Sequence, residues 1–428
     1  MRLMTRRMIC RGVFVTLCVV PTLLVGAAAL VVHTPVYARF RRASWESTLA
    51  ARLGVGVTIA RLDQVDGRRL ILHRLRLTDP ERGQDVAIIR SAELTREGTH
   101  WDVELNQCQV LAARLDWLTR RFHDHILETA DLGMTLRVHA ANLVLTGSEP
   151  VVCLADVTCQ MHDDPGGREV LVAVRMPGQS DDEPIRLRVV RNRQLDPPAT
   201  GWELHTGAAS LPCVVVSRWL PGAMRLGPEC MFGGSIWAER TMVGWNADLH
   251  GRLQDVDLDH LVTGSFPHKL SGMAQVQIAD CSILRGRITE VKGRIEAAHG
   301  VISASLLNAA AKALQLQRRA ASDVAMLVRY EKLALEFALD EKGLTVRGLA
   351  DARGGILQDA AGALLSARDP QPLSPLALVR LLVPDSRLNV PATKETAQLV
   401  RVLPLPEIVP TDTTNARIPY ASLRLHRR

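Results

Sequence analysis

The side chains best suited to chemistry in this sequence lie in the run His123-Asp124-His125. Imidazole nitrogens and carboxylate oxygens are common metal ligands, so this run is the strongest candidate for a metal site. The surrounding residues 112–125 favour a helix, and side chains two positions apart on a helix point in different directions. Both imidazoles therefore cannot reach one metal ion, and we predict that the chain holds no metal.

The other acidic clusters fit turns better than sites. His162 leads into the run 163–167 (DDPGG), which is typical of a turn with solvated acids. Asp255, Asp257 and Asp259 alternate, but no glycine or glutamate completes a calcium-binding loop. The sequence contains no nucleophile elbow, phosphate-binding loop, dinucleotide-binding fingerprint or zinc-protease motif. We therefore expect no catalytic residues and no cofactor, and we predict that the chain is not an enzyme.

Eight cysteines raise the questions of metal binding and disulfide formation. No C-x-x-C pair is present, which excludes zinc-ribbon and thioredoxin-like motifs. In an oxidising compartment, Cys153 with Cys159 and Cys213 with Cys230 are the short-range pairs. The alternative is that these residues are small buried hydrophobes, and the sequence leaves both open.

Residues 12–32 decide where any such chemistry would take place. This stretch carries no charge, and a helix of about twenty apolar residues spans the hydrocarbon core of a bilayer. Arginines flank it on both sides, at Arg2, Arg6, Arg7, Arg11, Arg39, Arg41 and Arg42. A cleaved signal peptide is the alternative, but its apolar region is shorter. We predict one transmembrane helix at the inner membrane of a bacterium, with the bulk of the chain in the periplasm. Residues 45–53 predict a short helix next to the membrane, which Gly54 ends.

The composition limits the class of partner. The 428 residues carry a formal net charge of +7, which the seven flanking arginines are enough to explain. Aromatic residues make up only 4% of the chain, and no basic run is interleaved with them, so platforms for stacking bases are missing. We predict no nucleic-acid partner and an interior built from aliphatic side chains.

Most of the chain after residue 54 alternates between apolar and polar residues, as strands do when one face is buried. Leu70, Leu72, Leu75 and Leu77 form two alternating pairs with one extra residue between them, which predicts a strand with a bulge. Similar runs separated by turns predict consecutive hairpins. The predicted fold is mainly β: an elongated, curved, antiparallel sheet of repeated hairpins that forms a groove, with a few helices.

A repeat is a further possibility. Gly251, Gly272 and Gly293 each precede alternating apolar residues and recur every 21 residues, a spacing that fits one hairpin per repeat. Beyond them, residues 305–319 predict an amphipathic helix, and a hairpin follows at residues 333–346.

These patterns divide the chain into five parts. Residues 1–11 are expected in the cytoplasm, and residues 12–32 form the transmembrane helix. Residues 33–300 form the β-rich region, and residues 301–366 form a module of helix and hairpin. Residues 367–428 are rich in proline and are expected to be a disordered tail that contains one short helix at most.

An apolar sheet face can either pack against a second layer or stay open and solvate acyl chains. Each acyl CH₂ hidden from water stabilises binding by about 0.8 kcal/mol, so such a groove needs no polar specificity. The candidate groove-lining residues are Leu249, Leu253, Ala274, Val276, Ile278, Leu333, Leu335 and Phe337. The expected partner is a phospholipid or another acyl-chain lipid.

The layout resembles the AsmA-like family, which includes TamB-type bacterial proteins. The N-terminal anchor, the early strand at residues 53–59 and the strand and turn at residues 70–80 carry this resemblance. The runs at residues 249–261 and 270–278 extend it. The resemblance implies a periplasmic β-groove that is anchored in the inner membrane and serves phospholipid transport or outer-membrane biogenesis. The alternative is a structural scaffold that binds other envelope proteins through its sheet edges.

Overall fold

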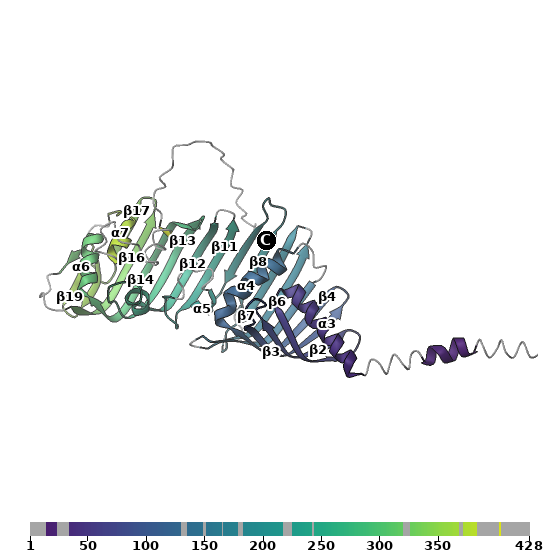
Figure 1. Ribbon diagram of the computed structural model, residues 1–428. Coiled ribbons are helices and arrows are strands. Elements are labelled where there is room, and N and C mark those ends of the chain that lie inside the picture. The colour runs from purple at the N-terminus through teal and green to yellow at the C-terminus, as the bar shows by residue number, and fades with distance from the viewer. Residues whose placement is uncertain are drawn as a thin grey trace, which may run out of the picture.

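The computed structural model describes residues 14–23, 34–129, 135–148, 151–164, 166–178, 183–216, 225–241, 244–319, 326–367, 371–382 and 402–403. Within these residues the chain is mainly β, as predicted, and its 19 strands form one open, mixed sheet (Figure 1). The strands are β1 (Gly56–Gln64), β2 (Arg69–Thr78), β3 (Asp85–Glu97), β4 (His100–Leu111), β5 (Thr135–Thr146), β6 (Val152–Asp164), β7 (Gly167–Arg175), β8 (Ile185–Asn192), β9 (Ala199–His205), β10 (Leu211–Pro212), β11 (Met231–Thr241), β12 (Gly244–Asp257), β13 (Met273–Leu284), β14 (Arg287–Ser303), β15 (Gln317–Arg318), β16 (Leu327–Asp340), β17 (Gly343–Gly348), β18 (Gly355–Asp359) and β19 (Gly362–Ser366). The helical segments are η1 (Val15–Val19), α3 (Pro35–Leu53), η2 (Ala112–Arg114), α4 (Leu115–Phe122), η3 (His123–Leu127), α5 (Cys213–Val216), η5 (Asp259–Thr263), α6 (Ala304–Ala313) and α7 (Leu376–Leu382).

Strands that follow one another in the chain are also neighbours in the sheet over most of its length. The order runs from β1 to β9, then through β11, β12, β13, β14 and β16. The prediction that all pairs are antiparallel is wrong at β4 and β5, which are parallel. The predicted helix at residues 112–125 is confirmed as η2, α4 and η3, and it supplies the crossover that parallel strands require.

The bulge predicted in β2 between Leu72 and Leu75 is wrong, because β2 stays in one-to-one register with β1 and β3 at Arg74. The face of the strand changes there through a residue with positive φ, which belongs to a crease that crosses several strands. Arg74 in β2, Gln107 in β4 and Asp156 in β6 have φ of 51°, 52° and 46°. The pairs on either side place Arg74 and Gln107 level with the same residue of β3, Arg90. In a regular strand, residues three positions apart point to opposite faces. At this level the alternation shifts by one residue in each of these strands, so Leu72 and Leu75 both point to the core and are buried. Left-handed residues bend a strand, and the crease thereby helps to curve the sheet.

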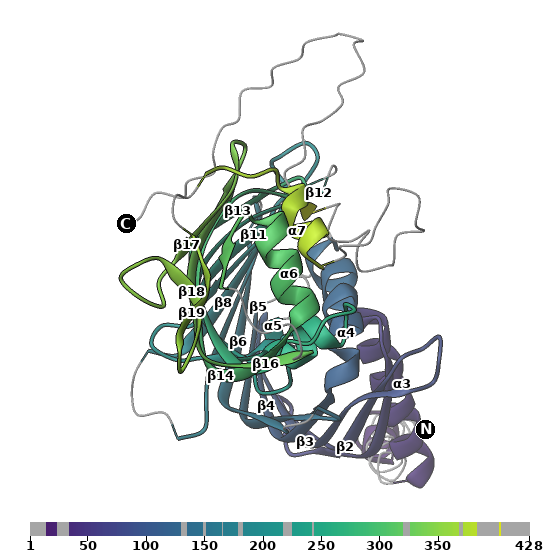
Figure 2. The same ribbon diagram turned by 90° about the vertical axis from the view of Figure 1, so that its left-hand side faces the viewer.

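Figure 2 shows the curved sheet end-on as a trough, with α4, α6 and α7 along its open side. One large core cluster lies in the first two thirds of the sheet, and α3 packs against it through Trp45, Leu49 and Leu53. A second cluster contains Leu306 and Leu307 of α6 together with the C-terminal strands. The apolar face of the sheet is therefore covered by helices along much of its length.

Helix α3 covers the edge strand β1. Pro35 lies at its first turn, the Thr34 side chain caps it, and Gly54 ends it with a φ of 66°. The guanidinium of Arg42 donates to Ala60 O at 3.2 Å, and the Ile59 N–H donates to Glu46 Oε1 at 2.8 Å. These contacts satisfy backbone groups that an uncovered edge would offer to another chain. The helix predicted from residue 45 is thus confirmed, although it begins ten residues earlier.

Two predicted boundaries do not coincide with breaks between elements. The boundary between residues 300 and 301 falls inside β14, which pairs with β16 in the same continuous sheet. Within the predicted tail, Leu373 pairs with Leu344, and the one short helix expected there is α7. Most of residues 367–428 lie outside the described residues. The helix predicted at residues 305–319 ends at Ala313, before β15.

The predicted glycine repeat is only partly reproduced. Gly251 in β12 pairs with Ile278 in β13, and Ile278 pairs with Gly293 in β14, so these two glycines share one level of the sheet. Gly272 instead precedes β13 with a φ of 129°, close to the Tyr330 hydroxyl. Only two of the three glycines therefore occupy equivalent positions.

The predicted transmembrane segment at residues 12–32 is described only at residues 14–23, which are helical. The rest of that segment lies outside the described residues. Among the residues that are described, no helix combines the length and the apolar character needed to cross a membrane.

Candidate functional site: an apolar cavity beneath α3

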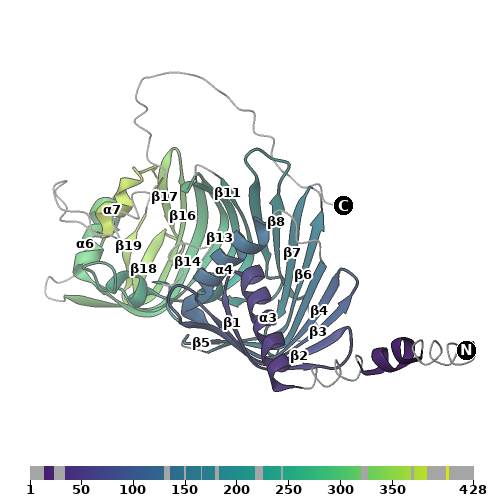
Figure 3. The same cartoon turned by 45° about the vertical axis from the view of Figure 1, so that its right-hand side comes forward.

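A cavity of about 700 Å³ lies between α3 and the first strands of the sheet. Figure 3 shows α3 and α4 over one face of these strands. Eighteen of the residues that line the cavity are apolar: Trp45, Leu49, Leu53, Val57, Leu70, Leu72, Leu75, Leu77, Ile89, Ala92, Leu94, Trp101, Val103, Leu105, Ile126, Leu136, Val138 and Met161. The volume lies within the range of about 300–1,000 Å³ found for small-molecule sites.

The helix side of the cavity comes from one face of α3. Arg41, Trp45, Leu49 and Arg52 line it, and their spacing of three or four residues places them along one stripe of the helix. The indole rings of Trp45 and Trp101 meet edge to face with 6.3 Å between their centroids. This aromatic pair joins α3 to the start of β4 and forms part of the cavity wall.

The sheet side is made by the inward-facing residues of β2, β3, β4 and β5. Leu72 and Ala92 are buried at 1% exposure and are paired across β2 and β3. Val103 and Val138 are paired across β4 and β5 and are half-buried, because the cavity lies against them. The crease at Arg74 keeps all these apolar side chains on the same face.

The polar lining of the cavity is strongly basic. It contains five arginines, Arg41, Arg52, Arg68, Arg69 and Arg96, and a single acid, Asp66. Arg68 and Arg69 follow the β1–β2 turn, and Arg96 lies at the end of β3. The end of the cavity at these turns is therefore a basic mouth, defined here by Arg41, Arg68 and Arg96.

Asp66 and Arg69 already have partners within the protein. The Asp66 carboxylate accepts from the backbone N–H groups of Arg68 and Arg69 at 2.7 and 2.8 Å, which lowers the pKa of Asp66. The Arg69 guanidinium pairs with Glu93, which raises the pKa of Arg69. Arg96 lies 5.4 Å from the centroid of the Trp101 ring, and its Nε donates to Gly98 O at 3.0 Å, whereas Arg41 lies 5.9 Å from the centroid of the Tyr37 ring. Neither of these two arginines forms an ion pair within the described part of the chain.

The residues predicted to line a groove lie elsewhere in the sheet. Leu249, Leu253 and Ala274 are buried in the large core cluster, and Val276, Ile278 and Leu333 pack against it. Leu335 packs against the C-terminal cluster, and the Phe337 ring lies over the backbone of Gly293.

A second hollow, of about 810 Å³, includes three of the predicted residues, Leu253, Val276 and Ile278. Most of the other side chains that line it are polar or charged: Arg252, Gln254, Gln275, Gln277, Arg294 and Glu296. This polar lining suits an acyl chain less well than the cavity beneath α3 does.

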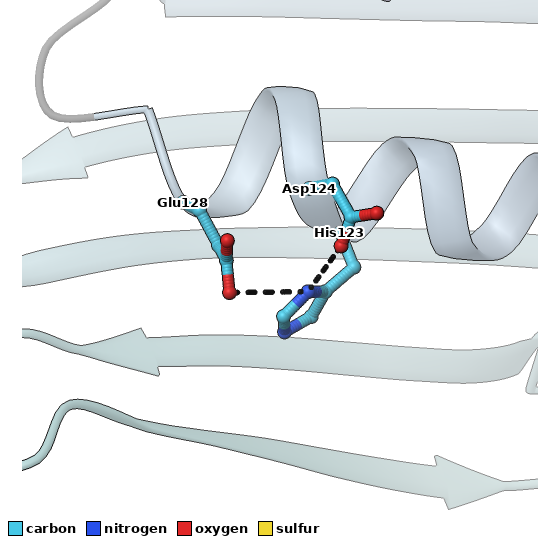
Figure 4. Close-up of side chains that lie close together, drawn as sticks. All are labelled: His123, Asp124 and Glu128. Atoms are coloured by element: carbon cyan, nitrogen blue, oxygen red, sulfur yellow. Dashed lines mark hydrogen bonds and ion pairs between the residues drawn. The ribbon is translucent and has the colours of Figure 1, made fainter.

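The histidine run separates as its helical spacing predicts. His123 is buried, and its Nδ1 lies 3.2 Å from Asp124 Oδ1 and 3.6 Å from Glu128 Oε1 (Figure 4). Its Nε2 lies 3.2 Å from the Thr200 hydroxyl. His125 instead packs against Gly54. Both carboxylates therefore meet one ring nitrogen, and the group is explained as a hydrogen-bonded junction between η3 and β9.

Of the two short-range cysteine pairs, the structure brings together only one. Cys153 and Cys159 lie in the same strand, β6, and six residues of strand extend about 20 Å, too far for a disulfide. Cys213 and Cys230 lie opposite each other, because the β10–β11 register of Leu211 with Phe232 continues to them. The Cys213 N–H donates to Cys230 O at 2.7 Å, and both residues are buried.

Sequence reasoning missed the cavity beneath α3 because the helix was predicted only from residue 45. The stripe of Arg41, Trp45, Leu49 and Arg52 is the signal that a longer helix would have made visible. Comparisons with protein-family models, curated proteins and solved structures find no match to this chain.

Proposed function

We propose that this protein binds an acyl-chain lipid in the cavity beneath α3 and handles phospholipid at the bacterial inner membrane. The observation that carries the proposal is a cavity of about 700 Å³ whose lining is mostly aliphatic. Burial of apolar surface is the main driving force for such a ligand, at about 0.8 kcal/mol for each CH₂ group. Insertion of a ten-carbon chain would contribute about 8 kcal/mol, which is comparable to the cost of about 4–15 kcal/mol for the freedom of motion lost on binding, and longer chains would contribute more.

The proposed placement at a membrane is supported by the N-terminal residues. Phe14, Leu17 and Leu23 are 62%, 70% and 67% exposed, as expected of side chains that face lipid. Val36 and Phe40 at the start of α3 are also exposed, at 73% and 71%, and their spacing places them on one side of the helix. We propose that residues 12–32 span the inner membrane and that the remainder is periplasmic, as in the AsmA-like family. The cavity would then lie close to the bilayer.

A scaffold that binds partners by adding strands to its edge is the alternative. Helix α3 already covers the edge strand β1, where Arg42 and Glu46 bind the backbone of Ala60 and Ile59. That edge is therefore not offered to another chain, which favours the lipid proposal.

Lipid bound by the cavity can be separated from lipid around the anchor with a matched pair of variants. Val103→Trp fills the cavity, whereas Glu104→Trp adds the same side chain at the next residue of β4, which is exposed. The full chain is purified in nonionic detergent, washed and extracted, and its lipid is measured by mass spectrometry. We expect about one lipid per protein in the wild type and in Glu104→Trp, and its loss in Val103→Trp. Equal lipid in all three proteins would contradict the proposal, provided that circular dichroism shows each to be folded.

A further inference from the structure

We propose that the basic mouth of the cavity, formed by Arg41, Arg68 and Arg96, selects a lipid with an anionic head group. This inference rests on the proposed function and goes further by naming the chemistry of the ligand. The acyl chain would occupy the apolar cavity, and a phosphate or carboxylate attached to it would be bound by guanidinium groups.

Two of the three arginines are fixed beside each other by the sheet. The N–H of Arg96 donates to Arg68 O at 2.9 Å, and the register of Arg69 with Thr95 places Arg68 directly opposite Arg96. Both side chains line the cavity, so they project to the same side of the sheet. Like charges in directly opposite positions destabilise a sheet unless something offsets them. An anion between the two guanidinium groups would provide that compensation.

The third arginine comes from the helix. Helix α3 runs antiparallel to β1, since Arg42 reaches Ala60 and the helix ends at Gly54, just before β1 begins. Arg41 therefore lies towards the β1–β2 turn, the same end of the cavity as Arg68. Three guanidinium groups from three separate elements thus surround one opening.

The charges at this opening are not balanced within the described residues. The only acid among the cavity-lining residues is Asp66, whose carboxylate is occupied by two backbone N–H groups. Glu93 pairs with Arg69 and leaves the mouth arginines to other partners. Guanidinium binds phosphate and carboxylate through two parallel hydrogen bonds, which gives both affinity and orientation.

The position of the mouth relative to the acyl cavity argues for a lipid rather than a free anion. Trp101 lies under the Arg96 guanidinium and also lines the cavity together with Trp45, so the charged and apolar parts are continuous. An amphiphile has the same arrangement of a charged end attached to an apolar chain. We therefore assign the mouth to the head group of the lipid that the cavity holds.

The test compares two lipids with identical acyl chains, phosphatidylglycerol and phosphatidylcholine, on the full chain in nonionic detergent. Native mass spectrometry measures binding to the wild type, to R68Q/R96Q and to R82Q/R353Q, which removes the same charge from two exposed turns. Charge-assisted hydrogen bonds predict that the wild type and the control prefer phosphatidylglycerol by about tenfold or more. R68Q/R96Q should lose this preference and keep its affinity for phosphatidylcholine.

The other outcomes of this test distinguish the head-group assignment from the proposal that the cavity binds a lipid. Equal affinity of the wild type for the two lipids would overturn the head-group assignment and leave the cavity proposal standing. An unchanged preference in R68Q/R96Q would also overturn it. Failure of the wild type to bind either lipid would overturn both proposals. Displacement of phosphatidylglycerol by inorganic phosphate alone would identify a free-anion site and overturn the assignment to a lipid.

Discussion

The backbone N–H of Arg96 donates to the carbonyl oxygen of Arg68 at 2.9 Å, so two arginines lie directly opposite each other at the ends of β3 and β2. Both side chains line the cavity beneath α3. The fold alone does not need two like charges at this position, because cross-strand pairs of opposite charge are more stable. The arrangement is explained if the pair binds an anion.

A single substitution separates binding from stability at this pair. Arg68 is exposed, so Arg68→Gln should change the free energy of unfolding by less than about 0.5 kcal/mol, as is usual at such surfaces. The same variant should bind phosphatidylglycerol several times more weakly than the wild type. Chemical denaturation and native mass spectrometry measure the two effects. A large loss of stability with unchanged binding would show that Arg68 has a structural role instead.

The opposed thiols of Cys213 and Cys230 predict a disulfide if this part of the chain folds in the periplasm, as proposed. Their mutual hydrogen bond and burial raise the pKa of the Cys213 thiol, whereas the same hydrogen bond lowers the pKa of Cys230. Both side chains are buried, so the reduced pair should react slowly with alkylating reagents. Oxidation by a periplasmic thiol oxidase during folding would close a loop of 18 residues and stabilise the fold by about 3 kcal/mol. Mass spectrometry before and after reduction and alkylation measures the bond.

The matched comparison for the thiols uses Cys153, which is exposed in β6. Protein secreted to the periplasm should show Cys153 free and the pair oxidised, whereas cytoplasmic expression should leave all three reduced. Free thiols at Cys213 and Cys230 in protein taken from the native host would argue against the periplasmic location.

The crease gives a prediction about backbone conformation. Gln107 adopts a φ of 52°, which glycine tolerates and a β-branched residue does not. Gln107→Val should lower the free energy of unfolding by about 1–3 kcal/mol, and Gln107→Gly should be close to neutral or slightly stabilising. Thermal and chemical unfolding followed by circular dichroism provide the measurement. Equal effects of the two substitutions would show that the left-handed conformation does not matter at this position.

Local alternation predicted much of this fold because each strand buries one face. The strand β2 and the change of face at Arg74 were both indicated by the spacing of Leu70, Leu72, Leu75 and Leu77. The parallel pair β4 and β5 was not predicted, although its crossover helix was, because the direction of a returning strand depends on tertiary packing.

The candidate site was harder to predict than the strands. Apolar alternation around Leu249, Ala274 and Val276 is as clear as that around Val103, yet Leu249 and Ala274 are buried in the core. Which apolar surface faces a cavity is decided by where helices such as α3 lie, and this is not local information. The mouth likewise joins Arg41, Arg68 and Arg96 from elements that alternation does not connect.

The most direct test of the account uses Trp45 and Trp101, whose rings line the cavity. The full chain in nonionic detergent is titrated with phosphatidylglycerol that carries bromine on its acyl chains, which quenches tryptophan fluorescence on contact. Unbrominated lipid, W45F/W101F and W117F/W237F serve as controls. We predict saturable quenching in the wild type and in W117F/W237F, and its loss in W45F/W101F. Equal quenching in all three proteins, or none in the wild type, would contradict the claim that a lipid chain occupies the cavity beneath α3.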